Sequence, residues 1–154
     1  MTRLVYLSIR AHGEESYPLE SCGVLLGAST PKGWQAIAAV RASNARTDSA
    51  HDRYSIAPLE LVRIERDARR QGHEIVGFYH SHPDHPPLWS ATDFADAHWL
   101  HYSYVITEVR KGMAAVTNAF LLTGSSEEEK RFEQQTIEVE ECGQDQSPSQ
   151  VSKH

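Results

Sequence analysis

The segment from Glu74 to Pro83 constrains the fold of this chain more than any other part of the sequence. Its apolar stretch, Ile75-Val-Gly-Phe-Tyr79, predicts a buried strand that runs without a break into His80-Ser-His-Pro83. Side chains at positions i and i+2 of a strand point to the same face, so the imidazoles of His80 and His82 are expected to converge. Pro83 should end the hydrogen-bonded ladder, which places the pair at the end of the sheet.

Helices and strands are interspersed around this segment without strict alternation. Two connections, at Pro31–Gly33 and at Lys111–Gly112, read as hairpin turns. This order favours a mixed α/β sandwich, with helices packed around a sheet, over a doubly wound parallel fold. We expect helices from Leu4 to Glu15, from Pro58 to Gly72 and from Ser90 to about Trp99, and further strands at Cys22–Gly27, Trp34–Ala42, Tyr104–Val109, Ala114–Leu122 and, as a final edge strand, Thr136–Val139.

The composition is that of one folded domain. With 154 residues, of which 40% are hydrophobic and 23% charged, we expect a single domain over residues 1–141 and a disordered polar tail over 142–154. No long apolar run suggests a membrane span or a secretory signal. The two cysteines, Cys22 and Cys142, do not suggest a disulfide framework, so the cytoplasm is the simplest compartment. A formal charge of −6 without a basic cluster argues against nucleic acid as a partner.

A helix start follows the histidine pair. Ser90-Ala-Thr-Asp93 has a Ser cap and an acidic residue three positions later. If the loop folds this helix start back over the strand end, the Asp93 carboxylate comes beside both imidazoles. Two imidazoles and one carboxylate are the ligand set of an open, catalytic zinc site. The alternative is that Asp93 and Ser90 only cap a helix and that the histidines are merely hydrogen-bonded.

A zinc hydrolase also needs a general base. Zinc lowers the pKa of its bound water from about 16 to roughly 7, and a carboxylate outside the ligand set must then move the proton. Glu20 lies just before an expected strand, but on spacing alone it is no better a candidate than Glu14, Glu15 or Glu74. Ser90 could donate a hydrogen bond to the developing oxyanion.

Two reactive side chains near these motifs are better explained by structural roles than by catalysis or metal binding. Cys22 begins an apolar strand, so a buried small hydrophobe is the better interpretation than a nucleophile. His85 lies in the loop between His82 and Ser90, and we interpret it as a residue at the rim rather than a ligand.

The motifs Glu20-Ser-Cys-Gly23, His80-Ser-His-Pro83 and Ser90-Ala-Thr-Asp93 resemble the signature of the JAMM (MPN+) metalloproteases, with every signature position filled. Arg53-Tyr-Ser-Ile-Ala-Pro58 and Ile75-Val-Gly-Phe-Tyr79 are also similar to compact prokaryotic members. The resemblance covers most of the chain, roughly residues 4 to 125. It implies a mixed β-sheet sandwiched by helices, in the JAB/MPN-like, or cytidine deaminase-like, architecture.

The resemblance also implies roles and a substrate. It makes His80, His82 and Asp93 the ligands of one zinc ion per chain, Glu20 the general acid/base, and Ser90 a support for the tetrahedral intermediate. Compact bacterial members resemble enzymes that cut after the C-terminal Gly-Gly of ubiquitin-like sulfur-carrier proteins, so such a carrier or its C-terminal adduct is the expected partner.

Two other functions stay open at this point. One is a catalytically silent MPN scaffold, although this chain keeps all the motif residues that such domains are expected to lack. The other is a DNA-repair-associated JAB-type protein, against which the lack of a basic patch counts. Exposed strand edges also leave a homodimer possible.

Overall fold

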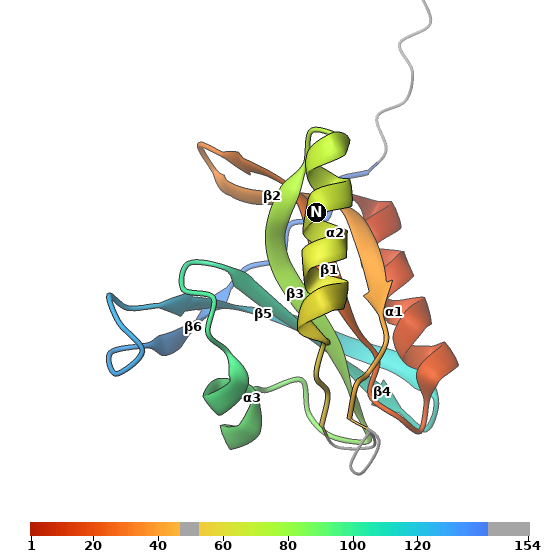
Figure 1. Cartoon of the computed structure of the whole chain (residues 1–154). Helices are drawn as coiled ribbons and strands as arrows, with labels where there is room; N and C mark the ends of the chain where they lie inside the picture. Colours follow the sequence, from red (N-terminus) through yellow and green to blue (C-terminus); the bar gives the residue numbers. More distant parts are fainter. Residues whose placement is uncertain (47–52, 142–154) are drawn as a thin grey trace, which may run out of the picture.

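The computed structural model describes residues 1–46 and 53–141, so the expected disordered tail lies outside the described residues. The chain forms one six-stranded sheet with the order β2-β1-β3-β4-β5-β6 (Figure 1). β3 and β4 pair in parallel, and the other neighbouring strands pair antiparallel. The elements are α1 (Arg3–Ser16), β1 (Cys22–Thr30), β2 (Gly33–Ala42), α2 (Pro58–Arg70), β3 (Glu74–Pro83), α3 (Ala91–Asp96), β4 (Ser103–Arg110), β5 (Met113–Thr123) and β6 (Arg131–Gln135).

Helices cover both faces of this sheet, as the sequence predicted (Figure 1). On one face, Val5 and Ile9 of α1 are buried in a cluster with side chains of the central strands. On the other face, Ile64 and Ala68 of α2 belong to a second buried cluster. β3 is central and is buried from its second residue to its last, which explains its continuous apolar sequence. No helix in the described part of the chain is long and apolar enough to cross a membrane.

The last strand is not where the sequence placed it. The sequence predicted a final edge strand at Thr136–Val139, but β6 is Arg131–Gln135, and the prediction was wrong. The ring of Phe132 packs against Phe94 and against other aromatic side chains, which fixes 131–135 beside β5. The following residues leave the sheet, and Ile137 packs against the cluster under α1 instead.

The third helix is shorter than expected. It ends at Asp96 rather than near Trp99, because Ala97 adopts an extended backbone conformation. Ala97 is buried in the cluster under α2, so its side chain packs into the core there instead of continuing the helix.

Gly23 lies where strands β1, β2 and β3 crowd together. A Cβ atom at this position would overlap the ring of Tyr79 and the carbonyl oxygen of Val40. We expect Gly23→Ala to lower the free energy of unfolding by about 1–3 kcal/mol, as overpacked cores do. Chemical denaturation measures this, with Ser29→Ala, an exposed position on the same strand, as the control within about 0.5 kcal/mol of the native protein. Equal stability of Gly23→Ala and the native protein would contradict the crowding.

Candidate metal centre

Two imidazoles meet at the end of β3. His80 and His82 are buried, with 2% and 7% of their surfaces exposed. Their Nε2 atoms lie 3.0 Å apart, which confirms the convergence that the i, i+2 spacing predicted. The strand ends at Pro83, directly after the pair, so the site lies at the end of the sheet as expected.

The N-terminus of α3 brings a carboxylate to this pair. Ser90 is the N-cap, and its Oγ accepts a hydrogen bond from the backbone N–H of Asp93 at 3.0 Å. The Asp93 Oδ2 accepts in return from the Ser90 N–H at 2.7 Å, which completes a capping box. The two oxygens of Asp93 also lie 3.2 Å from the Nε2 atoms of His80 and His82. Asp93 is therefore a helix cap and a member of the cluster at the same time.

The spacing of these donors suits a metal ion. One ligand atom from each of His80, His82 and Asp93 lies within 4.8 Å of the others. Tetrahedral zinc with bonds of about 2.0–2.1 Å to nitrogen and oxygen holds its ligand atoms roughly 3.3 Å apart, close to the distances between these donors. Two nitrogens and a carboxylate leave a fourth position for water, which is the donor set of a catalytic rather than a structural zinc site.

The two histidines are oriented in different ways. The Nδ1 of His82 lies 2.8 Å from the carbonyl oxygen of Pro86, which places the proton on Nδ1 and leaves Nε2 free to bind a metal. The Nδ1 of His80 is buried and has no hydrogen-bond partner among the described residues. Its ring instead stacks against Tyr54, with ring centroids 4.4 Å apart and an interplanar angle of 26°.

The electrostatics of the cluster favour an ionised carboxylate. Burial alone would raise the pKa of Asp93, but the hydrogen bonds with His80 and His82 outweigh it and hold that pKa well below its usual range. Burial lowers the pKa of His80, and the hydrogen bond with Asp93 offsets this only in part. For His82 burial is outweighed by Asp93 and by the Pro86 carbonyl, so its pKa is raised. An ionised Asp93 and a neutral His80 are the forms that bind a metal.

Glu20 lies beside the pair because of the register between β1 and β3. The ladder sets Cys22 opposite His80, and the Ser81 N–H donates to the Ser21 carbonyl at 3.0 Å. The ladder begins at Cys22, and its register, continued by two residues, would set Glu20 opposite His82, where opposite residues of an antiparallel pair point to the same face. Glu20 is buried, with 6% of its surface exposed, and its charge helps to raise the pKa of His82.

The other acidic candidates are engaged elsewhere. Glu14 accepts a hydrogen bond from the backbone N–H of Ala114 at 2.9 Å, and Glu15 forms an ion pair with Arg41. Glu74 lies at the opposite end of β3 from the histidines. The structure thus distinguishes Glu20 from residues that spacing alone could not separate from it.

A pair of serines under the cluster is a feature that sequence reasoning missed. Ser81 lies between the two histidines and therefore points to the other face of the sheet. Its Oγ accepts hydrogen bonds from the Ser21 backbone N–H at 2.8 Å and the Ser21 hydroxyl at 3.1 Å. Gly13 of α1 packs so closely over this pair that a Cβ there would lie 3.3 Å from the Cβ of Ser81. The serines join the strand end that carries Glu20 to the one that carries the histidines.

Cys22 and His85 lie where the sequence predicted them, outside the candidate site. Cys22 is buried, and burial, with help from the charges of Glu60 and Glu20, raises the pKa of its thiol to about 12. A neutral, buried thiol is no nucleophile, which confirms the interpretation from the sequence. His85 is exposed and is not a member of the metal-binding group.

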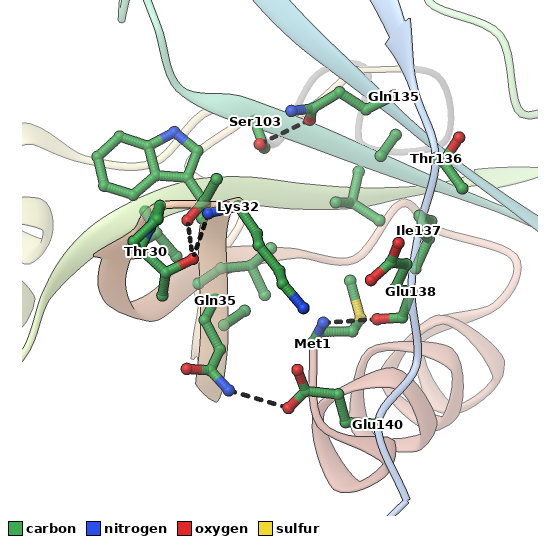
Figure 2. A pocket seen from close by; sticks show the side chains of 18 residues that line it. Met1, Thr30, Lys32, Gln35, Ser103, Gln135, Thr136, Ile137, Glu138 and Glu140 are labelled. Atoms are coloured by element: carbon green, nitrogen blue, oxygen red, sulfur yellow. Dashed lines mark hydrogen bonds between the residues drawn. The ribbon is translucent and has the colours of Figure 1, made fainter.

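A cavity of about 910 Å³ lies away from this cluster, on the α1 face near the opposite end of the sheet (Figure 2). Its rim is held by hydrogen bonds from Gln35 to Glu140 at 2.9 Å and from the Met1 amino group to the Glu138 carbonyl at 2.7 Å. Neither the histidine pair nor Glu20, Ser90 or Asp93 lines it. The cavity and the His-His-Asp group are therefore separate features.

The fold is one mixed sheet between helices, and the site joins two histidines at the end of its central strand to Asp93 of α3 and to the buried Glu20 that precedes β1. This combination defines the class of protein. The model of the family Prok-JAB, prokaryotic homologs of the JAB domain, matches residues 2–122. The chain therefore belongs to the prokaryotic JAB-domain family, which confirms the resemblance seen in the motifs.

Three relatives illustrate the likeness. A protein of Haloferax volcanii named desampylase is 39% identical over 103 residues, which are 64% of this chain and 72% of that protein. A solution structure of a protein from Desulfitobacterium hafniense has a TM-score of 0.76 and 25% identity, and the match covers 91% of each chain. A solution structure from Salinibacter ruber has a TM-score of 0.65 and 38% identity over 86% of each chain.

Proposed function

We propose that this protein is a zinc-dependent isopeptidase or peptidase that hydrolyses the bond after the C-terminal Gly-Gly of a ubiquitin-like protein. The observation that carries the proposal is the convergence of His80, His82 and Asp93 at one strand end, with the buried Glu20 on the same face. The similarity to a desampylase supports an isopeptide bond to a ubiquitin-like modifier as the target.

In this proposal His80, His82 and Asp93 hold the metal, and Glu20 and Ser90 act on the substrate. A bound zinc ion would supply a water of lowered pKa and polarise the scissile carbonyl. Glu20 accepts the proton of the attacking water on its carboxylate and passes it to the leaving amine. The Oγ of Ser90 accepts from the Asp93 N–H, so its own proton is available to donate to the oxyanion.

The substrate is proposed to be small, with an extended C-terminus. Such a tail can lie as an added strand and be held mainly by backbone hydrogen bonds, which suits a Gly-Gly sequence without side chains. Two connections near the site are short: β4 and β5 are joined through Lys111 and Gly112, and residues 97–102 join α3 to β4. Because neither of these two connections carries an inserted segment that could grip a large surface, a sulfur-carrier protein or its adduct suits the site better than polyubiquitin.

Metal content tests the site directly. We expect the native protein to bind close to one zinc ion per chain and His82→Ala to bind far less, because the substitution removes one of three donors. Elemental analysis of both proteins after dialysis against trace zinc measures this. His85→Ala, which changes a nearby exposed histidine, is the matched control and should keep its zinc. If native protein and His82→Ala are both free of zinc, the proposed function fails.

Incubation with carrier-protein fusions that end in Gly-Gly-X tests the reaction. The native protein should release X, and a chelator should stop the release. A zinc-loaded protein that cleaves none of these fusions, nor a modifier joined to lysine, would favour the scaffold reading instead.

Two expectations from the sequence stay predictions. One is a cytoplasmic location. The other is a homodimer, for which β2 and β6 are the two edge strands of the sheet.

A further inference from the structure

We propose that Tyr54 is a positioning residue, which fixes the plane of the His80 imidazole so that its Nε2 points at the metal position. The inference rests on the proposed function, because it concerns one of the ligands named there. It starts from the difference between the two histidines, since a ligating histidine normally donates its second ring N–H to an acceptor. His82 has such an acceptor in the Pro86 carbonyl, whereas His80 has none among the described residues.

The contact of His80 with Tyr54 can supply the missing restraint. The rings lie 4.4 Å apart at 26°, which is a stacked pair rather than an edge contact. A ring held parallel to a neighbour cannot tilt about its Cβ–Cγ bond without losing that contact. The stack therefore keeps the His80 Nε2 directed at the same point as the Nε2 of His82 and the Oδ1 of Asp93.

The backbone on both sides of Tyr54 is fixed by one side chain, that of Asn44. Its Oδ1 accepts from the Ser55 N–H at 3.1 Å, and its Nδ2 donates to the Arg53 carbonyl at 2.9 Å. The Ala45 N–H adds a bond to the Ser55 carbonyl at 2.7 Å. Asn44 thus binds the backbone of both neighbours of Tyr54. These hydrogen bonds fix the position from which the Tyr54 ring contacts His80.

The same segment also contacts the element that carries the third ligand. Arg46 forms an ion pair with Asp96 of α3 at 3.4 Å, three residues after Asp93. The Ser43 N–H donates to Glu60 of α2 at 3.1 Å, which ties the start of the segment to the helix above the sheet. Residues 43–46 and 53–55 therefore contact His80 directly and, through Arg46 and Asp96, the helix that carries Asp93.

Zinc affinity, measured by competition with a chromophoric chelator, tests the inference in the full-length protein. We expect Tyr54→Phe, which keeps the ring, to bind zinc within about two-fold of the native protein. Tyr54→Leu, which keeps bulk but cannot stack, should bind about ten-fold more weakly, in the range for residues that orient a ligand. The visible spectrum of the cobalt-substituted Leu variant should change as well, whereas that of the Phe variant should not.

The matched control is Tyr102→Leu, which removes another stacked tyrosine, the partner of Trp34. It should leave zinc affinity and the cobalt spectrum unchanged. A Tyr54→Leu protein with native zinc affinity and a native cobalt spectrum would overturn the inference. An equal loss of zinc affinity in Tyr54→Phe would also overturn it, because the hydroxyl rather than the stacked ring would then matter. If Tyr54→Leu does not fold, Asn44→Ala takes its place and should weaken zinc binding; unchanged binding there overturns the inference. A native protein that binds no zinc contradicts the proposed function itself, which is a different result.

Discussion

Glu20→Gln is expected to lower kcat for cleavage of a Gly-Gly fusion by about 10²- to 10⁴-fold, the usual contribution of a general acid or base. Glutamine has nearly the same shape as glutamate, so it fills the same buried position, but its amide cannot accept the proton of the attacking water. Zinc content should not change, because Glu20 is not one of the three donors in the metal-binding group. Steady-state kinetics with metal-loaded protein, together with elemental analysis, measure both quantities.

The control for this variant is Glu14→Gln. Glu14 is exposed and accepts a backbone hydrogen bond from β5, so its substitution should leave the rate within about two-fold of the native value. A Glu20→Gln protein that cleaves as fast as the native enzyme would remove Glu20 from the mechanism. The metal site would still stand, since its test is independent.

The second large effect is expected for Asp93→Asn. The amide oxygen of asparagine can still accept from the Ser90 N–H, so the helix cap is preserved, but the negative charge that faces both imidazoles is lost. Residues that only orient a ligand change metal affinity by about 10- to 100-fold, so loss of a charged ligand should cost at least about 100-fold. Equilibrium competition with a chelator measures the affinity.

Ser90→Ala is the complementary variant, because it weakens the helix cap but keeps the Asp93 carboxylate. It removes the oxygen that accepts from the Asp93 N–H and should cost about 1 kcal/mol of stability, as lost N-caps do. Its zinc affinity should stay within a few-fold of native. If Asp93→Asn instead binds zinc as the native protein does, Asp93 is a cap and nothing more.

The histidine pair was predictable from the sequence because it depends only on the two-residue period of a single strand. The Asp93 carboxylate was predictable in part, because a capping box is a local pattern, although its position over the strand end depends on the path of the loop. These local features gave the candidate ligands before any long-range contact was known.

The rest of the site depends on contacts between distant segments. Glu20 faces His82 only through the register of β1 against β3, which spacing does not reveal, and the resemblance rather than the residues singled it out. Tyr54 lies in the segment Arg53–Pro58 and had no role assigned from the sequence, because its stack on His80 depends on contacts of Arg53 and Ser55 with the distant Asn44. The final strand was misplaced because Phe132, in an otherwise polar segment, packs among aromatic side chains from other elements.

The single parallel pair in the sheet has a consequence for how such an enzyme can diversify. Parallel neighbours cannot be joined by a tight turn and need a crossover of a dozen or more residues. Here the crossover from β3 to β4 contains Ser90 and Asp93 near its middle and residues 97–102 at its end. Lengthening its late part costs little, about 0.6 kcal/mol for each doubling of a loop, and leaves the ligand positions in place. New substrate-binding surface can therefore be added beside the proposed metal site without rebuilding the sheet that carries the two histidines.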